Sequence, residues 1–364
     1  MFEKRKVRRH FLRGGIAIFA MAVLSAALFA AVSHSESFAI RVYTPFSRAV
    51  SGWIGAAFSF TPYSAAEILL LLLALAVLAY LVCAIVAAVR RQNGWSLLRW
   101  VFDLLLTAVA VIFVFLLLWG CNYATPKLET RMPYDTSPQP QEVLFETAAW
   151  HLGQVRLHSE LAGGDRSAFA DVAGRAAVAV KALTEARPDL MGGGVVSPPK
   201  RMIFADVLGY LGISGIYSPF TGECHVTPIG TAPFLPSTMC HEMAHRLGFA
   251  PEEDANMIAY LACAGSGDAL VRYSGELLAF NYCYGALSDP ELRAALWNGL
   301  PQAAKDDYAA NAEAWRQYEG PLRDVAASVN DTYLKAMRQP EGVKSYGRVV
   351  DMLIALNLER NSDN

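Results

Sequence analysis

Two histidines and a glutamate stand at a spacing that suits metal chemistry, in the segment CHEMAH at residues 240–245. Residues four apart share one face of a helix, so His241 and His245 can direct two imidazoles at one point. Glu242 lies one step round the helix, within reach of a water at that point. This HExxH pattern predicts a Zn²⁺ site that lowers the pKa of its bound water, with Glu242 as the general base.

A catalytic zinc site needs three protein ligands and one open position, and the residues after the motif offer the third ligand. The segment GFAP at 248–251 is expected to end one helix at its glycine and to open the next at its proline. Glu252 then falls in the first turn of the second helix, and a short connection brings it back towards the histidines. We expect Glu252 as the third ligand, with Asp254 and Glu253 as alternatives because the three acids are consecutive. Asn256, four residues after Glu252, is expected to hydrogen-bond a histidine or the carboxylate.

The elements that position these residues are mostly helices. Apolar residues recur with a period near 3.6, which predicts helices at about 140–161, 166–187, 236–249, 252–264, 267–286, 289–299, 302–317, 320–337 and 342–357. Between the second and third, glycine and proline recur, and short β-favouring pieces at 201–204 and 223–227 predict a small sheet before the HExxH helix. Residues 222–227 alternate like an edge strand, which would either border the cleft and pair with an extended substrate or be an ordinary edge strand.

The composition predicts a membrane protein. The 364 residues are 54% hydrophobic and 18% charged, with a mean hydropathy of +0.28, whereas soluble domains are nearer a quarter charged. Three apolar runs hold the excess, and they predict transmembrane helices at about 14–33, 67–89 and 101–120. We therefore expect a membrane region at 1–120, a linker at 121–139 and a domain at 140–364. The first run is expected to be a retained signal-anchor, although a cleaved secretory signal is the alternative.

The positive charges predict the orientation. Six Lys/Arg residues precede the first run and three fill the loop between the second and third, whereas the 34–63 loop holds two. The N-terminus is then cytoplasmic and the C-terminal domain extracytoplasmic, in a multi-pass protein of the cell membrane whose first partner is the lipid bilayer. The 34–63 loop is expected to be an amphipathic connector on the membrane surface. A net charge of −2 argues against nucleic-acid binding. Nothing in the sequence predicts an oligomeric state.

Two cysteines flank the predicted metal site. Cys240 precedes the first histidine and Cys263 ends the following helix, so a disulfide between them would join the two helices. Two free buried thiols are the alternative.

The motifs resemble known proteins. HExxH followed by a Glu-x-x-Ala-Asn helix resembles the gluzincin type of zinc metallopeptidase. The combination of PFTGE (219–223), CHEMAHRLGFA (240–250), EEDANMIAYLAC (252–263), a late NDTYLK and SYGRVVD more closely resembles a bacterial membrane-protein family of unknown function with an HExxH motif. The resemblance implies His241, His245 and Glu252 as ligands and Glu242 as base. The chain departs from gluzincins in one respect, because they usually place the third ligand much farther from HExxH than the seven residues between His245 and Glu252.

These features together predict a mainly α protein: N-terminal transmembrane helices followed by a zincin-like, mostly helical domain that hydrolyses peptide bonds of a peptide or protein substrate. The alternative is a non-catalytic membrane-anchored sensor or assembly factor, in which a structural zinc braces the helix pair. Glu242 separates the two, because a structural zinc site has four protein ligands and needs no base beside its first histidine. A transporter is disfavoured because Glu67 and Asp103 lie at the ends of the spans.

Overall fold

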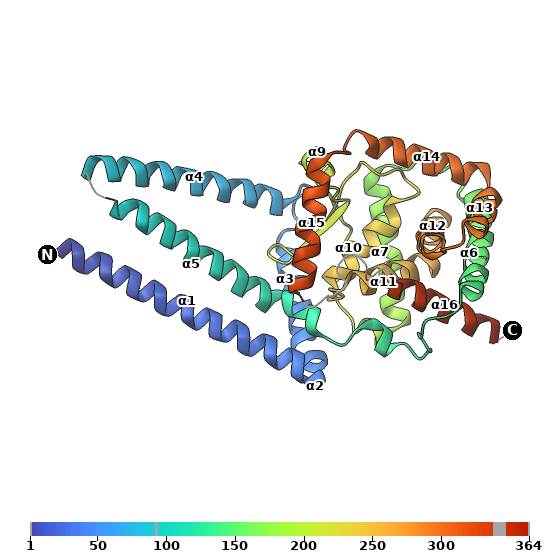
Figure 1. Cartoon of the computed structure of the whole chain (residues 1–364), viewed down its shortest axis with the longest axis horizontal. Helices are drawn as coiled ribbons and strands as arrows, with labels where there is room; N and C mark the ends of the chain where they lie inside the picture. Colours follow the sequence, from blue (N-terminus) through green and yellow to red (C-terminus); the bar gives the residue numbers. More distant parts are fainter. Residues whose placement is uncertain (1, 92–93, 338–346, 363–364) are drawn as a thin grey trace.

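Three long helices extend from one side of a helical domain in the computed structural model, which describes residues 2–91, 94–337 and 347–362 (Figure 1). The N-terminus lies at the far tip of these helices, and the C-terminus lies at the opposite end of the molecule. A small sheet lies within the domain, close to the ends of the long helices. The predicted mainly α fold is confirmed.

The long helices are α1 (Phe2–His34), α4 (Ala65–Arg91) and α5 (Trp95–Leu118). In the described part of the chain, each contains a segment long and apolar enough to cross a membrane, with mean hydropathies of 2.4, 3.1 and 2.9. Most of their apolar side chains are exposed, as they are on helices whose surroundings are lipid. The three predicted spans therefore appear as helices at the expected places.

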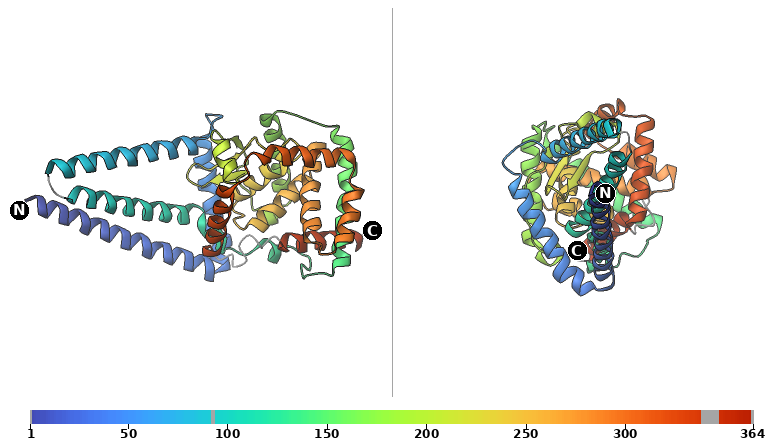
Figure 2. Two further views of the ribbon diagram at one scale, coloured as in Figure 1. Left: turned by 45° about the horizontal axis from the view of Figure 1, so that its top comes forward. Right: turned by 90° about the vertical axis from the view of Figure 1, so that its left-hand side faces the viewer.

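The segment between α1 and α4 forms α2 (Glu36–Phe38), a π-helical turn (Ala39–Tyr43) and α3 (Thr44–Ala57). Figure 2 shows α3 lying across the ends of the long helices rather than along them. One side of α3 packs on the domain: Arg48 Nε donates to the carbonyl of Leu247. Gly55 allows its backbone to approach the carbonyl of Gly222 more closely than a Cβ would permit. The predicted connector is thus a helix with one face on the domain.

The domain is built from α6 (Gln141–Ala162), α7 (Phe169–Ala186), α8 (Pro188–Met191), α9 (Ala205–Tyr210), α10 (Leu235–Arg246), α11 (Glu252–Ala264), α12 (Ala269–Ala286), α13 (Pro290–Gly299), α14 (Gln302–Arg316), α15 (Pro321–Ala336) and α16 (Gly347–Ser362). α10 and α11 pack against each other and against α7 and α12, with Met239, Met243 and Ile258 almost fully buried. The helices predicted from periodicity all appear, the one at 252–264 with the predicted bounds and the others with one or both ends shifted. The start of the one predicted at 342–357 lies outside the described residues, and α16 is its described part.

The sheet has three strands in the described residues, in the order β1 (Lys200–Arg201), β3 (Glu223–Val226), β2 (Gly215–Ser218). β3 runs parallel to β1 and antiparallel to β2. The prediction that 222–227 forms an edge strand is therefore wrong: β3 is central, and all four of its residues are buried. Alternating apolar and polar residues suggested a strand with one exposed face, but both faces of β3 are covered. Within the described residues, no strand pairs with the outer edge of β2.

Two carboxylates fasten α4 to this sheet. Glu223 of β3 accepts hydrogen bonds from the backbone N–H groups of residues 65 and 66, at 3.3 and 3.0 Å, at the start of α4. Lys200 Nζ lies 2.5 Å from the same carboxylate. In return, Glu67 of α4 accepts from the backbone N–H groups of residues 203 and 204, both at 2.8 Å. Each carboxylate satisfies backbone donors that have no partner within their own element, so α4 and the sheet are held in one orientation.

The predicted linker also packs on the domain in its first half. It forms the 3₁₀ turns η2 (Gly120–Ala124) and η3 (Leu128–Arg131). The side chain of Leu128 is fully buried, and its N–H donates to Asp254 Oδ2 at 3.1 Å. Residues on both sides of position 120, the predicted end of the membrane region, therefore pack on the domain.

Candidate metal centre

A tight turn joins the two helices that carry the candidate ligands. α10 ends at Arg246, and Gly248 adopts a left-handed conformation with φ of +87°. The N–H of Phe249 bonds the carbonyl of Ala244 at 3.1 Å, which closes the helix end in the manner that glycine allows. Pro251 then precedes α11, whose first residue is Glu252. The short connection turns the chain back on itself, as the sequence predicts.

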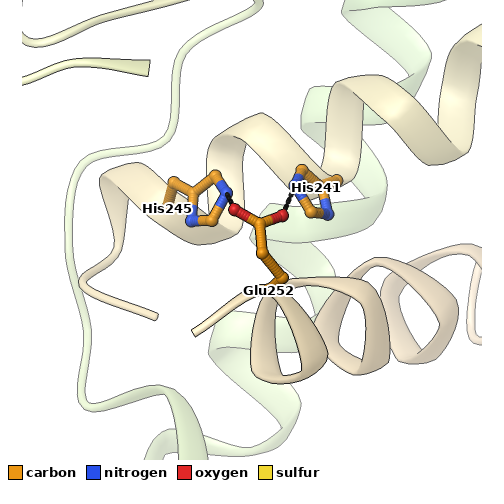
Figure 3. Close-up of side chains that lie close together, drawn as sticks. All are labelled: His241, His245 and Glu252. Atoms are coloured by element: carbon orange, nitrogen blue, oxygen red, sulfur yellow. Dashed lines mark ion pairs between the residues drawn. The ribbon is translucent and has the colours of Figure 1, made fainter. Parts of the chain in front are cut away.

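This turn brings His241, His245 and Glu252 together (Figure 3). Ligand atoms of the three residues lie within 4.8 Å of one another. Glu252 Oε2 lies 3.3 Å from His241 Nε2, and Glu252 Oε1 lies 3.7 Å from His245 Nε2. The carboxylate comes from α11 and points at two imidazoles that come from one face of α10.

Each imidazole is oriented through its other nitrogen. His241 Nδ1 lies 2.9 Å from Asn256 Oδ1, and His245 Nδ1 lies 2.8 Å from the carbonyl of Phe249. Both partners are acceptors, so Nδ1 of each ring carries a proton and each Nε2 faces the carboxylate of Glu252. Metal-binding histidines are fixed in this way by hydrogen bonds from their second nitrogen. The predicted hydrogen bond between Asn256 and a histidine of the motif is therefore present, and the histidine is His241.

The two alternative acids point elsewhere. Glu253 Oε1 lies 3.0 Å from Lys127 Nζ, and Asp254 accepts from the N–H of Leu128. Burial and the neighbouring charge of Glu253 raise the pKa of Asp254 to about 8. Only Glu252 of the three consecutive acids is brought to the histidines in the described structure.

The charges of the cluster are strongly coupled. Burial lowers the pKa of His241, but the hydrogen bond and charge of Glu252 outweigh it and raise the pKa to about 9. Burial together with the charge of His241 lowers the pKa of His245 to about 4. Burial raises the pKa of Glu252, but the two histidines lower it to about 2. One anionic carboxylate thus faces two nitrogens, and two imidazoles with a carboxylate form a donor set that Zn²⁺ accepts.

Glu242 is buried beside this cluster, with only 4% of its surface exposed. Its Oε2 atom has no hydrogen-bond partner among the described residues. The carboxylate rests against Gly215 of β2, where any side chain would overlap it. Burial raises the pKa of Glu242 to about 8, a change that the charge of His241 opposes. A buried carboxylate without a partner is costly for stability, which is unusual outside functional sites.

Residues from the membrane-proximal segments hold the end of α10. The indole of Trp119, directly after α5, donates to the carbonyl of His245 at 2.9 Å, and its ring contacts the His245 ring. Arg48 of α3 donates to the carbonyl of Leu247, two residues after His245. Helix C-termini carry unpaired carbonyls, and here distant side chains satisfy them. Sequence reasoning missed both residues because more than a hundred positions separate them from the motif.

Two tyrosines lie on the Glu252 side of the cluster. The rings of Tyr123 and Tyr333 contact each other with centroids 5.9 Å apart. Burial raises the pKa of both, and the charge of Glu252 raises it further. The sequence analysis does not single them out, because one follows a span and the other lies in α15.

A cavity of about 500 Å³ lies beside the start of α10, and Glu242 is not among the residues that line it. Thr238, one turn before Glu242 on α10, lines it together with Ser214, the residue before Gly215. Thr227 also lines it, and its hydroxyl has no partner among the described residues. Arg323 of α15 lies at its rim over Gly212. The cavity has the size of a small-molecule or side-chain pocket, and its lining residues Ser214 and Thr238 are close in sequence to Gly215 and Glu242.

Cys240 and Cys263 lie side by side as the sequence suggests. Their sulfur atoms are 3.7 Å apart, and both are free thiols in the structure. Of the two alternatives, the structure has the free buried pair.

Comparison with known proteins places the chain in a family. No curated protein and no solved structure matches it. A family model described as "Protein of unknown function (DUF3810)" matches residues 42–354. The match includes α3, α4, α5 and nearly all of the domain, so the prediction of an uncharacterised family is confirmed, whereas the resemblance to gluzincins stays a prediction. The chain belongs to the DUF3810 family, whose function is unknown.

Proposed function

We propose that this protein is a membrane-anchored zinc metallopeptidase that hydrolyses peptide bonds. The observation that carries the proposal is the convergence of His241, His245 and Glu252 beside the buried Glu242. Both histidines are oriented by acceptors at Nδ1, which is the arrangement of metal ligands.

The ion would be held by Nε2 of His241, Nε2 of His245 and the Glu252 carboxylate, which leaves a position for solvent in a four-coordinate site. When bound, Zn²⁺ makes a water acidic near neutral pH and polarises a carbonyl. Asn256 and the Phe249 carbonyl keep the two imidazoles in the required tautomer.

Glu242 supplies the proton transfers. Its free Oε2 accepts the proton of the attacking water, and the same carboxyl group later donates it to the nitrogen of the leaving amine. Contact with Gly215 restricts the carboxylate to one place. This role also favours hydrolysis over the alternative of a structural zinc brace, because a brace gives no reason to bury an unpartnered carboxylate.

The outer edge of β2 supplies the surface for an extended substrate. It is unpaired in the described residues, and Gly215 of the same strand contacts Glu242. A peptide that adds to this edge is brought beside the candidate base. The cavity lined by Ser214 and Thr238 then lies where a substrate side chain can enter.

We also propose that the domain faces the extracytoplasmic side. The six basic residues at the start of α1 and the three at the adjoining ends of α4 and α5 (Arg90, Arg91 and Arg99) outnumber the two of the 34–63 segment, and such residues stay in the cytoplasm.

The proposal is tested on the full-length protein with Glu242→Gln and a control, Glu146→Gln, whose side chain is exposed on α6. We expect about one zinc per chain in all three proteins by mass spectrometry of the metal. Hydrolysis of a mixed fluorogenic peptide library should occur with the wild type and Glu146→Gln and be absent with Glu242→Gln. Absence of zinc from the wild type overturns the site, and equal hydrolysis by Glu242→Gln overturns the mechanism.

A further inference from the structure

α15 carries an apolar stripe that faces no other part of the described protein. Leu322, Val325 and Val329, spaced by three and four residues, are 61%, 61% and 64% exposed. α15 is wholly described, and its one buried residue is Leu334. A helix of sixteen residues with so little packing is marginally stable in water. We therefore expect its apolar side to be covered by something other than the described protein.

The position of α15 identifies that contact. In Figures 1 and 2, α15 lies across the domain-side ends of α4 and α5, roughly perpendicular to them. α3 lies at the same level, and the neighbouring Trp53, Phe60 and Tyr63 are 76%, 80% and 64% exposed. Aromatic residues concentrate at the boundary between lipid and water. The three apolar helices place a bilayer on one side of this level, so α15 lies close to the lipid surface.

We propose that α15 is an interfacial helix that binds the surface of the bilayer crossed by α1, α4 and α5, through Leu322, Val325 and Val329. A helix with an apolar side and a polar side lies flat in the headgroup region, with its apolar residues towards the acyl chains. Asp324 and Ser328, each next to an apolar residue in sequence, point about 100° away from it round the helix and face water or headgroups.

The same helix borders the candidate active site. Arg323 near its start lies at the rim of the cavity, and Tyr333 near its end contacts Tyr123 on the Glu252 side. Lipid binding by α15 therefore places the metal cluster and its cavity at the membrane surface. Under the proposed function, the substrates are peptide segments that lie at this surface; that consequence rests on the proposed function, whereas the lipid contact does not.

Spin labels test the lipid contact without any measurement of activity. Single cysteines replace Val325, Val329, Asp324 or Ser328 in full-length protein with Cys83→Ser, because Cys83 is the one exposed native cysteine. Each protein is labelled and placed in phosphatidylcholine–phosphatidylglycerol nanodiscs. Collisions with oxygen, which concentrates in lipid, are compared with collisions with a water-soluble nickel complex. We expect the oxygen-to-nickel ratio to be at least about fivefold higher at 325 and 329 than at 324 and 328. Equal ratios at the four positions overturn the proposal.

Charge insertion provides a second measurement. In nanodiscs, Val325→Asp combined with Val329→Asp should make the backbone amides of α15 exchange with deuterium about tenfold faster, because the helix loses its lipid contact. Asp324→Asn combined with Ser328→Asp is the control and should leave the exchange unchanged. All four positions are exposed, so neither variant disturbs the domain core. Unchanged exchange in the Val325→Asp, Val329→Asp protein also overturns the proposal.

Discussion

Glu223 and Glu252 are both buried or half-buried carboxylates that face histidine, but their surroundings differ. Glu223 is held by Lys200, by two backbone N–H groups of α4 and by His225, so positive charge and donors surround it. Glu252 faces the two imidazoles His241 and His245, whose Nδ1 atoms are already occupied. The first site is complete within the protein. The second presents three ligand atoms to one point, which is the property of a cation site.

The difference teaches how to separate a structural carboxylate from a functional one. At the structural site, removing the carboxylate leaves a lysine and backbone donors without a partner, so the cost appears in folding. At the candidate metal site, the carboxylate accepts few hydrogen bonds from the protein. Removing it should therefore lower the affinity for metal rather than the stability of the fold. Substitutions at the two positions should therefore have opposite signatures.

The largest effect is expected for Glu252→Gln. The variant loses one of three ligands and the only anionic one, so bound zinc should fall from about one per chain to near zero. The measurement is metal analysis after dialysis against a weak chelator. Glu253→Gln is the matched control, because Glu253 follows Glu252 in sequence but pairs with Lys127 instead of the histidines, and this variant should keep its zinc. Loss of zinc from Glu253→Gln but not from Glu252→Gln would show that Glu252 is not the third ligand.

Glu223→Ala should act on stability and leave the metal in place. We expect the free energy of unfolding to fall by about 3 kcal/mol, because Lys200 and the first turn of α4 lose their partner. Denaturant unfolding in mild detergent measures it. Glu146→Ala, at an exposed position, should change it by less than about 0.5 kcal/mol. A Glu223→Ala protein as stable as the control would show that the contacts of Glu223 with Lys200 and the start of α4 do not stabilise the fold.

Asn256→Ala should weaken zinc binding without abolishing it. The amide orients His241, and loss of such a supporting hydrogen bond lowers metal affinity by about 10- to 100-fold. Competition with a fluorescent zinc chelator measures the affinity. Asn298→Ala, on the exposed side of α13, is the control. Unchanged affinity in Asn256→Ala would mean that the ring is held by other contacts.

The smallest effect is the acid sensitivity of the Glu223 site. Burial raises the pKa of Glu223, but the nearby His225 ring and the Lys200 ammonium outweigh it and lower the pKa from its usual 4.5 to about 2. A carboxylate with a lowered pKa in the folded state stabilises the protein above its unfolded pKa, and this stability is lost as the pH falls from 4.5 towards 2. Between pH 6 and pH 4 the loss is about 0.8 kcal/mol. The difference in stability between the wild type and Glu223→Ala should shrink by that amount, and a constant difference would contradict it.

The sequence was sufficient for the site's local geometry. A helix places His241 and His245 on one face, and Gly248 with Pro251 closes a turn short enough to return Glu252 to them. The choice among three acids required the structure, because it depends on Lys127 and Leu128, each of which lies 126 residues from the acid it contacts.

Contacts between distant segments were beyond sequence periodicity. The central position of β3 depends on pairing with strands on both sides, whereas its own alternation indicated an edge. The mutual capping of α4 and the sheet by Glu67 and Glu223 joins residues more than 130 positions apart. The sequence around Glu67 or Glu223 does not indicate which residues each carboxylate contacts, since a carboxylate in a first helical turn is common.

The indole of Trp119 gives the cluster a mechanical link to the bilayer. α5 has 24 residues and is therefore about 36 Å long, and its apolar part is close to a hydrocarbon thickness of about 30 Å, so that a thinner bilayer would make it too long. A helix that is too long for its bilayer tilts, and the tilt changes with lipid thickness. Because Trp119 continues α5 and holds the carbonyl of His245, a change in tilt is transmitted to one of the ligands, and thin and thick membranes would hold that imidazole at different angles.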